Sequence, residues 1–254
     1  MNVLVTGGTG YFGKGFVKKL LANNLAERIC IYSRGEFAQH KMREEFNDSR
    51  LRWFIGDVRD YDRLKRAMHE CDTVVHAAAL KRIEVVEYNV LEAVATNVYG
   101  TENVVKACID AGVKKAVLLS TDKACEPCTA YGYSKAMAES IFTSARHYAG
   151  AGGPTFCVTR YGNVAGSTGS VIPLWRELLK KQDWVPVTNS MMTRFWMTQG
   201  EAVDLVLKAI KDGKPGELIV PDLPAYYVGD LAAAMKADFK IIGMRGIEKI
   251  HECM

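Results

Sequence analysis

The chain has 254 residues, a length that suits one large α/β domain or one such domain with a small lobe. Its 33 basic and 29 acidic residues give a formal net charge of +4, too weak a bias to indicate nucleic-acid binding but suited to an anionic small molecule. The N-terminus lacks the features of a secretory signal, and no apolar run approaches the roughly 18 residues of a membrane helix. We therefore expect a cytoplasmic protein that has neither a membrane nor a nucleic acid as its partner.

From the first residue onward, short apolar strands alternate with amphipathic helical stretches. Because these strands mostly lack polar alternation, they suit a sheet that is covered on both faces. The β-α-β-α order predicts an α/β protein with a Rossmann-type doubly wound parallel sheet. The predicted strands are Asn2–Thr6, Arg28–Tyr32, Leu51–Ile55, Thr73–His76, Lys115–Leu119 and Thr155–Thr159. The predicted helices are 12–23, 60–69, 88–111 with a break near Gly100, and 131–149.

The composition changes after about residue 163. The segment GNVAGSTGSVIP is rich in Gly and Ser, and helices near 171–182 and 199–212 then alternate with short strands at 185–188 and 217–220. We expect a nucleotide-binding Rossmann domain over 1–163 and a smaller substrate-binding C-terminal lobe over 164–254. The two are expected to interleave in one compact unit, and the lobe has no obvious second core.

Three glycines form a G-x-x-G-x-x-G pattern between the first strand and the first helix. Glycine permits the tight turn and lets backbone N–H groups approach a pyrophosphate, to which the helix N-terminus adds partial positive charge. Since the pattern opens a βαβ unit, it predicts a dinucleotide site rather than a glycine turn without a ligand. The residues expected to bind the cofactor here are Gly7, Thr9, Gly10, Tyr11, Phe12 and Gly13.

Ser33 and Arg34 stand at the end of the second strand, where NAD-binding folds place an Asp or Glu against the ribose. An arginine can form a bidentate pair with a 2′-phosphate, which a carboxylate would repel. We therefore favour NADP over NAD as cofactor. A solvated surface arginine is the alternative, and the nearby Glu36 leaves NAD as the second choice.

Two further loops follow the third and fourth strands, at the edge where open α/β sheets bind ligands. The loop GDVRD places an aspartate near the expected adenine, and the small residues of HAAALK let a ribose approach the backbone. The cofactor-binding residues expected in these loops are Asp57, Val58, Ala77, Ala78, Ala79 and Lys81.

Tyr131 and Lys135 are four residues apart at the start of a predicted helix, so both project from one face. A nearby ammonium favours phenolate and lowers a tyrosine pKa from its usual value of about 10. The spacing therefore predicts that Tyr131 is a base toward a sugar hydroxyl while hydride leaves the same carbon. An exposed helix pair is the alternative, which the preceding Rossmann loop disfavours.

Asp122 and Lys123 form a second acid/base pair. Elimination of water beside a ketone needs a base for the proton next to the carbonyl and an acid for the departing hydroxyl, and a carboxyl and an amine can divide these roles. An ordinary charged loop is the alternative.

Cys125 and Cys128 form a C-x-x-C nearby, but they lack both a second ligand pair and a thioredoxin-like context, so we expect neither a metal nor a redox site. We expect His76 to be a packed loop residue.

Several segments together resemble the extended short-chain dehydrogenase/reductase superfamily. Within it, the chain is similar over nearly its whole length to the soluble UDP-N-acetylglucosamine 4,6-dehydratases of polysaccharide biosynthesis. The segments that carry the resemblance are TGGTGYFG, YSRGE, FIGDVRD, HAAALK, EYNVLEAVATNVYGTENV, LSTDKA, YGYSK, RYGNVAGSTGSVIP and MTRFWMT. The STDKA and RYGNV…GSVIP segments are much more specific than the glycine loop.

The resemblance implies a lyase that converts UDP-N-acetylglucosamine to a UDP-4-keto-6-deoxy sugar, with internal hydride transfer through bound NADP. In this cycle Tyr131, assisted by Lys135 and Thr121, deprotonates the C4 hydroxyl as hydride leaves. Lys123 then removes the C5 proton, and Asp122 protonates the departing C6 hydroxyl. Hydride finally returns to C6.

The same matching implies further binding roles. Asn97, Tyr131 and Lys135 are implied to contact the cofactor. The substrate-binding residues that it implies are Lys81, Asn163, Val171, Pro173, Arg194 and Glu248. Family members usually continue beyond a GEKLHE-like stretch, whereas this sequence stops at IEKIHECM.

Other functions stay open beside the dehydratase. The tyrosine in YGYSK favours the soluble type whose product is inverted at C5, but it does not by itself decide the face to which the proton returns. The alternatives are a UDP-sugar epimerase, a UDP-glucose 4,6-dehydratase and a non-catalytic NADP-binding protein. Asp122 and Lys123 argue against an epimerase, which needs no elimination. We also expect a homo-oligomer.

Overall fold

The computed structural model describes residues 1–244 and 248–254. Its main sheet contains β1 (Asn2–Thr6), β2 (Arg28–Ser33), β3 (Leu51–Ile55), β4 (Thr73–His76), β5 (Lys115–Leu119), β6 (Thr155–Thr159) and β10 (Glu217–Ile219). These seven strands are parallel and follow the order β10-β6-β5-β4-β1-β2-β3. This order confirms the doubly wound parallel sheet predicted from the sequence. Its physical basis is that continuous apolar strands of this kind need cover on both faces.

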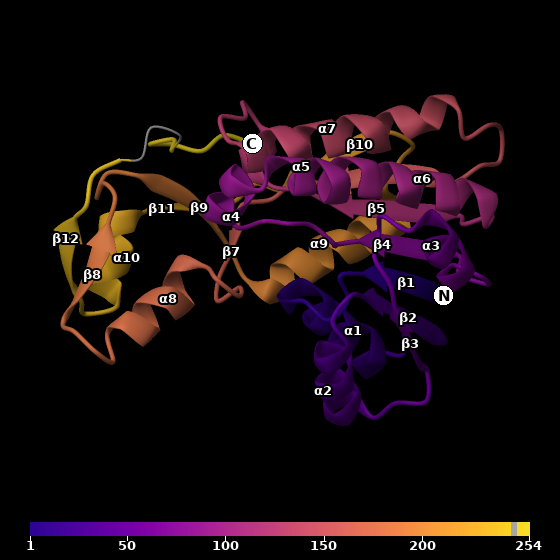
Figure 1. Cartoon of the computed structure of the whole chain (residues 1–254), viewed down its shortest axis with the longest axis horizontal. Coiled ribbons are helices and arrows are strands. Elements are labelled where there is room, and N and C mark those ends of the chain that lie inside the picture. The colour runs from indigo at the N-terminus through magenta and orange to yellow at the C-terminus, as the bar shows by residue number, and fades with distance from the viewer. Residues whose placement is uncertain (245–247) are drawn as a thin grey trace.

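Helices cover both faces of the main sheet (Figure 1). They are α1 (Tyr11–Ala22), α2 (Glu36–Phe46), α3 (Tyr61–Ala67), α6 (Gly100–Asp110), α7 (Ala130–Ser144) and α9 (Gln199–Asp212). On one face, α3, α6 and α7 bury a core that includes Leu64, Val104 and Phe142. On the other face, α1, α2 and α9 bury Phe16 and Met42 with their neighbours.

Two stretches of the Rossmann part differ from the sequence prediction. Helix α2 was not predicted, because it buries only Gln39 and Met42 and so has no apolar stripe. The predicted helix over 88–111 consists of α5 (Val90–Ala93), the π-helical segment η1 (Val94–Tyr99) and α6. Helix α4 (Ile83–Tyr88) precedes it.

A small lobe lies at the left of Figure 1. It contains α8 (Val171–Leu178), β8 (Trp184–Val187), α10 (Val228–Ala234) and β12 (Asp238–Ile241), and β8 pairs with β12 in parallel. Trp175 is 2% exposed and packs with Val185, Val187 and Ala232. The expectation that the lobe has no second core is thus wrong, because apolar residues far apart in the sequence converge on this tryptophan.

A three-stranded sheet joins the lobe to the main body. It has the order β11-β9-β7 and contains β7 (Asn163–Val164), β9 (Thr193–Met197) and β11 (Ala225–Tyr227). Beyond residue 164 the chain also returns to the main body, where α9 packs on one face and β10 extends the main sheet beside β6. In the described ranges, none of the helices has the length and apolarity that a membrane crossing requires.

Candidate functional site

One cavity of about 650 Å³ opens at the carboxyl ends of the main-sheet strands. It includes the point where the strand order reverses between β1 and β4, which is where doubly wound folds bind ligands. Most of the predicted cofactor-binding residues line it. They are Gly7, Thr9, Gly10, Tyr11, Phe12, Gly13, Ser33, Arg34, Asp57, Val58, Ala77, Ala78, Ala79, Lys81, Tyr131 and Lys135.

The glycine loop forms a cradle with no room for side chains. Gly7 has φ of +65°, and a Cβ there would lie 2.9 Å from the backbone nitrogen of Ala78. A Cβ at Gly13 would collide with the carbonyl oxygen of Gly8, so only glycine lets the start of α1 approach the loop this closely. The N-terminus of α1 therefore borders the cavity with its backbone N–H groups, which suits an anion.

At the second-strand end of the cavity, Arg34 stands beside Asp57. Its Nη1 lies 3.9 Å from Asp57 Oδ2, and its side chain is 56% exposed. Burial alone would raise the pKa of Asp57, but the hydrogen bonds and charge of Arg59 and the charge of Arg34 lower it. Arg34 thus combines a free approach from solvent with a place on the cavity wall.

Asn97 is the one predicted cofactor residue that does not border the cavity. It is 1% exposed, and its side-chain oxygen accepts a hydrogen bond of 2.8 Å from the Leu80 backbone N–H. Its amide nitrogen donates to the Leu80 carbonyl and to Ser134 Oγ, each at 2.9 Å. Asn97 therefore fastens the loop after β4 to helix α7.

His76 is buried behind that loop. Its ring nitrogens lie 2.7 Å from Thr6 Oγ1 and 3.1 Å from Thr101 Oγ1. Burial, and then the charge of Lys135, lower the pKa of His76 to about 3. The prediction that His76 is a packed residue is confirmed, although it is the last residue of β4 and not part of the loop.

The start of α7 places Tyr131 and Lys135 in the cavity. Thr129 caps the helix by accepting a hydrogen bond of 3.0 Å from the Gly132 N–H, so Tyr131 falls in the first turn. Lys135, one turn later, donates a hydrogen bond of 2.7 Å to the Leu119 carbonyl. Burial lowers the pKa of Lys135 to about 8, although the charge of Glu139 opposes this shift.

The pKa of Tyr131 is displaced in the direction opposite to the prediction. Burial of the phenol raises it first, the negative charge of Asp122 raises it further, and a hydrogen bond with Thr121 opposes both. The predicted lowering by Lys135 was wrong, because the ammonium is directed at the Leu119 carbonyl and the phenol has lost its hydration.

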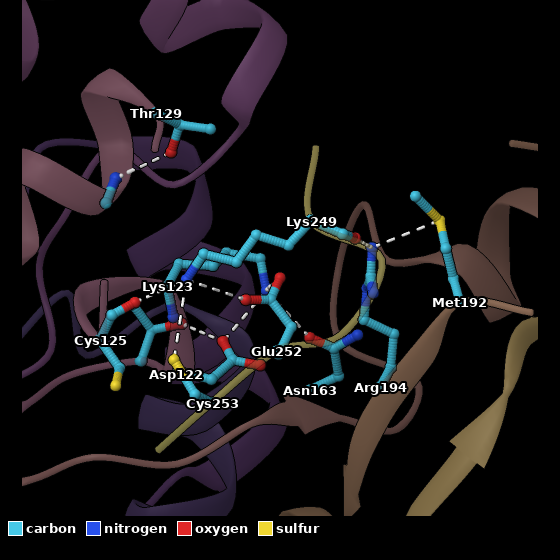
Figure 2. A network of polar contacts seen from close by, with 12 residues as sticks. Asp122, Lys123, Cys125, Thr129, Asn163, Met192, Arg194, Lys249, Glu252 and Cys253 are labelled. Atoms are coloured by element: carbon cyan, nitrogen blue, oxygen red, sulfur yellow. Dashed lines mark hydrogen bonds and ion pairs between the residues drawn. The ribbon is translucent and has the colours of Figure 1, made fainter. Parts of the chain in front are cut away.

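Asp122 and Lys123 follow β5 in a short 3₁₀ helix, η2 (Asp122–Ala124), and form a close ion pair at the cavity edge (Figure 2). Lys123 Nζ lies 3.0 Å from Asp122 Oδ1 and donates to Asn163 Oδ1 at 3.4 Å. Thr121 Oγ1 donates to the same Asp122 oxygen at 2.8 Å. Lys123 lines the cavity, whereas the fully buried Asp122 lies behind it, and Asp122 Oδ2 has no hydrogen-bond partner within the described ranges.

The predicted substrate residues separate into two groups. Lys81, Asn163 and Val171 line the cavity, and burial followed by the charge of Arg82 lowers the pKa of Lys81. Pro173, Arg194 and Glu248 do not line it. The structure thus brings only the first group to the catalytic candidates.

Arg194 instead holds the C-terminal segment, by which we mean residues 248–254. Its Nη1 donates to the Ile250 carbonyl and its Nη2 to the Lys249 carbonyl, each at 3.1 Å. Pro173 lies in the first turn of α8, and Glu248 begins the C-terminal segment.

Several residues at or near the cavity were not among the predicted site residues, and three of them bear on its geometry. Tyr161 and Gln199 line it, and Gln199 Nε2 donates to the Tyr11 carbonyl at 2.6 Å. Glu252 approaches Lys123, with Oε1 3.6 Å from Nζ. Tyr161 lies in the RYGNV segment, which could have marked it, whereas Gln199 and Glu252 reach the site only through contacts far along the chain.

The strand order, the glycine loop at its reversal point and the Tyr131-Lys135 spacing define a Rossmann-type protein of the extended short-chain dehydrogenase/reductase superfamily. Within that class, the chain belongs to the family described as polysaccharide biosynthesis protein, whose model matches residues 3–254. The resemblance seen in the sequence is thereby confirmed.

Relatives of known name include more than one activity. The chain is 45% identical over 256 residues to a UDP-N-acetylglucosamine 4,6-dehydratase (inverting) from Campylobacter jejuni, covering 100% of this chain and 77% of that protein. It is 41% identical over 262 residues to a UDP-glucose 4-epimerase from Rickettsia prowazekii, with the same two coverages of 100% and 77%. A solved structure of Pen from Bacillus thuringiensis is 40% identical, with a TM-score of 0.95 over 99% of this chain and 82% of that one.

Proposed function

We propose that the chain is a nucleotide-sugar 4,6-dehydratase, a hydro-lyase that converts UDP-N-acetylglucosamine to a UDP-4-keto-6-deoxy sugar inverted at C5. The observation that carries the proposal is the Asp122-Lys123 ion pair at the edge of the cavity that also contains Tyr131 and Lys135. The 45% identical dehydratase from Campylobacter jejuni supports the same chemistry.

NADP is the proposed cofactor, and the chain's residues fit it. The glycines let the start of α1 lie close to the loop, where a Cβ would collide with backbone, so that N–H groups can approach a pyrophosphate, and Arg34 offers a cation to a 2′-phosphate. When bound, NADP supplies a hydride acceptor for C4 and a hydride donor for C6.

The oxidation half of the cycle needs a base for the C4 hydroxyl, and Tyr131 is placed for it. The Thr121 hydrogen bond favours the phenolate form, while burial and Asp122 oppose it. Lys135 lines the same cavity, so its charge acts on any substrate oxygen held there. Asn163 and Lys81 are proposed to orient the sugar from the cavity wall.

The elimination half needs an acid and a base at once, and one proton supplies both. In the ion pair that proton is on Lys123; its transfer across 3.0 Å to Asp122 leaves a neutral amine and a carboxylic acid. The amine takes the C5 proton, the C5–C6 double bond forms, and the C6–O bond breaks as Asp122 gives its proton to the departing hydroxyl. The pair then again holds one proton, on Lys123.

The last proton transfer can be balanced through Thr121. When hydride returns to C6, Lys123 gives its proton to C5, so the pair lacks one proton while Tyr131 has gained one from the C4 hydroxyl. Thr121 is hydrogen-bonded to both Tyr131 and Asp122. This path is the proposed route by which the proton returns and the enzyme resets.

A UDP-sugar epimerase is the second candidate, favoured by the 41% identical relative from Rickettsia prowazekii. Epimerisation uses Tyr131, Lys135 and the cofactor but gives no role to the Asp122-Lys123 pair. UDP-glucose is the second candidate substrate, because the same groups would serve it. A protein that only binds NADP would have no use for either pair.

The deciding experiment is incubation of the purified protein with NADP and either UDP-N-acetylglucosamine or UDP-glucose, followed by mass spectrometry of the nucleotide sugar. Loss of one water supports dehydration, and the faster of the two substrates identifies the sugar. An isomer of unchanged mass supports epimerisation instead, and an untouched substrate despite bound NADP contradicts both enzymes. We also propose that the protein is a cytoplasmic homo-oligomer. Light scattering of the purified protein would test the oligomeric state.

A further inference from the structure

Glu252 places a second carboxylate against Lys123 (Figure 2). It is not among the residues that line the cavity. Its Oε1 lies 3.6 Å from Lys123 Nζ, and its Oε2 lies 3.8 Å from Lys249 Nζ. Asp122, Lys123, Glu252 and Lys249 therefore form a row of charges that alternate in sign. Their side chains are only 0%, 20%, 6% and 16% exposed, respectively.

The burial of Glu252 gains little stability for the fold. Both of its ion pairs are longer than a hydrogen bond, and Oε2 has no hydrogen-bond partner within the described ranges. Within the described ranges Oε2 therefore does not recover the hydration that it loses on burial. A contribution to the neighbouring site explains this placement better than a contribution to stability.

The position of Glu252 is nevertheless well fixed. Arg194 holds the backbone carbonyls of Lys249 and Ile250, and Lys249 Nζ donates a hydrogen bond of 2.6 Å to the Cys125 carbonyl. The C-terminal segment is thereby tied both to β9 and to the loop that follows η2. Glu252 is thus held beside Lys123 from two directions.

We propose that Glu252 is a positioning residue for Lys123: it holds the amine at the cavity edge and stabilises the positive charge that forms there when the C5 proton is taken. This role rests on the dehydratase function proposed above. The other groups that face this amine are Asp122, Asn163 and Tyr226, the last hydrogen-bonded to Asn163. Of these, only Asp122 is a carboxyl group, and in the proposed step it is neutral until it gives its proton to the departing hydroxyl. Glu252 is the carboxylate that stays charged throughout the elimination.

Two variants separate this charge effect from packing. Glu252→Gln keeps the shape and removes the charge, whereas Glu252→Asp keeps the charge and shortens the side chain. With UDP-N-acetylglucosamine and NADP, we expect water loss by Glu252→Gln to be at least about tenfold slower than in the wild type. NADP reduction, which depends on Tyr131, should persist. NADPH should therefore accumulate at the start of the reaction, which its absorbance would show. Glu252→Asp should be the faster of the two variants.

Glu177→Gln is the matched control, since Glu177 is 68% exposed and pairs only with Lys180 on the lobe surface among the contacts of the described residues. It should retain the wild-type rate. Two results would overturn the proposed role of the Glu252 charge while leaving the dehydratase function in place. One is a Glu252→Gln rate equal to that of the wild type, and the other is a Glu252→Asp rate below that of Glu252→Gln. Absence of water loss in the wild type would instead overturn the dehydratase function, and this role with it. Thermal unfolding and NADP binding of each variant establish that it is folded.

Discussion

The phenol of Tyr11 donates a hydrogen bond of 2.8 Å to the backbone carbonyl of Ala165. Tyr11 begins α1 beside the glycine loop, and Ala165 follows β7 at the entrance to the lobe. This hydrogen bond therefore joins the proposed cofactor side of the cavity to the segment that leads from β7 toward its proposed sugar side.

Removal of that bond should weaken substrate binding more than cofactor binding. In Tyr11→Phe the ring remains and one partly buried hydrogen bond of about 1 kcal/mol is lost, so KM for the UDP-sugar should rise about fivefold. The Kd of NADP, measured by titration of NADPH fluorescence, should stay within about twofold of the wild type, because the lost contact does not involve the backbone of the glycine loop. Tyr148→Phe is the control, because Tyr148 is exposed. Equal weakening of both ligands would refute a separate effect on the sugar side.

Replacement of the proposed base should stop water loss without preventing cofactor binding. Lys123→Ala removes the amine that faces the cavity, so the nucleotide sugar should show no loss of water by mass spectrometry while NADP still binds. It also leaves the buried Asp122 without the cation at 3.0 Å, which should lower the free energy of unfolding by up to about 3 kcal/mol. Lys106→Ala, at an exposed i,i+4 pair, should change neither quantity noticeably. Normal turnover by Lys123→Ala would exclude Lys123 as the base.

The choice of cofactor can be tested at Arg34. Arg34→Ala removes the cation proposed to meet the 2′-phosphate, and a charged hydrogen bond of about 1.5 to 3 kcal/mol corresponds to roughly a tenfold to hundredfold weaker binding of NADP. Binding of NAD, which has no such phosphate, should be unchanged. Calorimetric titration with both dinucleotides measures the two constants, and Arg43→Ala on α2 is the control. An unchanged ratio of NADP to NAD affinity would argue for NAD.

His76 should make stability depend on pH. Its pKa is about 3 in the fold against 6.5 when exposed, so as pH falls from 6.5 toward 3 the unfolded chain binds a proton that the folded chain does not. The stability that the neutral His76 contributes is fully present above pH 6.5 and falls by about 1.4 kcal/mol for each pH unit below it. Urea unfolding should show that the free energy of unfolding of the wild type is lower at about pH 5 than at about pH 7, with about 2 kcal/mol of the difference due to His76. In His76→Gln the difference should be smaller by that amount. His69→Gln, at an exposed histidine, should keep the loss; the same pH dependence in His76→Gln would contradict this account.

The sequence was sufficient for the elements whose own residues determine them. Continuous apolar strands such as Val3 to Val5 need cover on both faces, and the glycine loop has steric demands that only its spacing meets. Helix α2 was missed because its surface is almost wholly polar, so its one deeply buried apolar residue, Met42, gives no periodic signal.

The parts of the site that were not predicted depend on contacts distant in sequence. Arg194 was expected at the substrate, but its guanidinium binds backbone carbonyls 55 and 56 residues further on. Glu252 approaches Lys123 only because that segment is held in place. The pKa of Tyr131 was predicted from its neighbour one turn away, whereas the loss of hydration on folding decides its direction.

The seventh strand of the main sheet has a consequence for biosynthesis. Strands β1 to β6 are complete by Thr159, but β10, the neighbour of β6, begins only at Glu217, after much of the lobe has been synthesised. As the chain leaves the ribosome, β6 therefore presents a bare row of N–H and C=O groups, a template for pairing with another nascent chain. Translation that pauses between these two points should leave the polypeptide most in need of a chaperone.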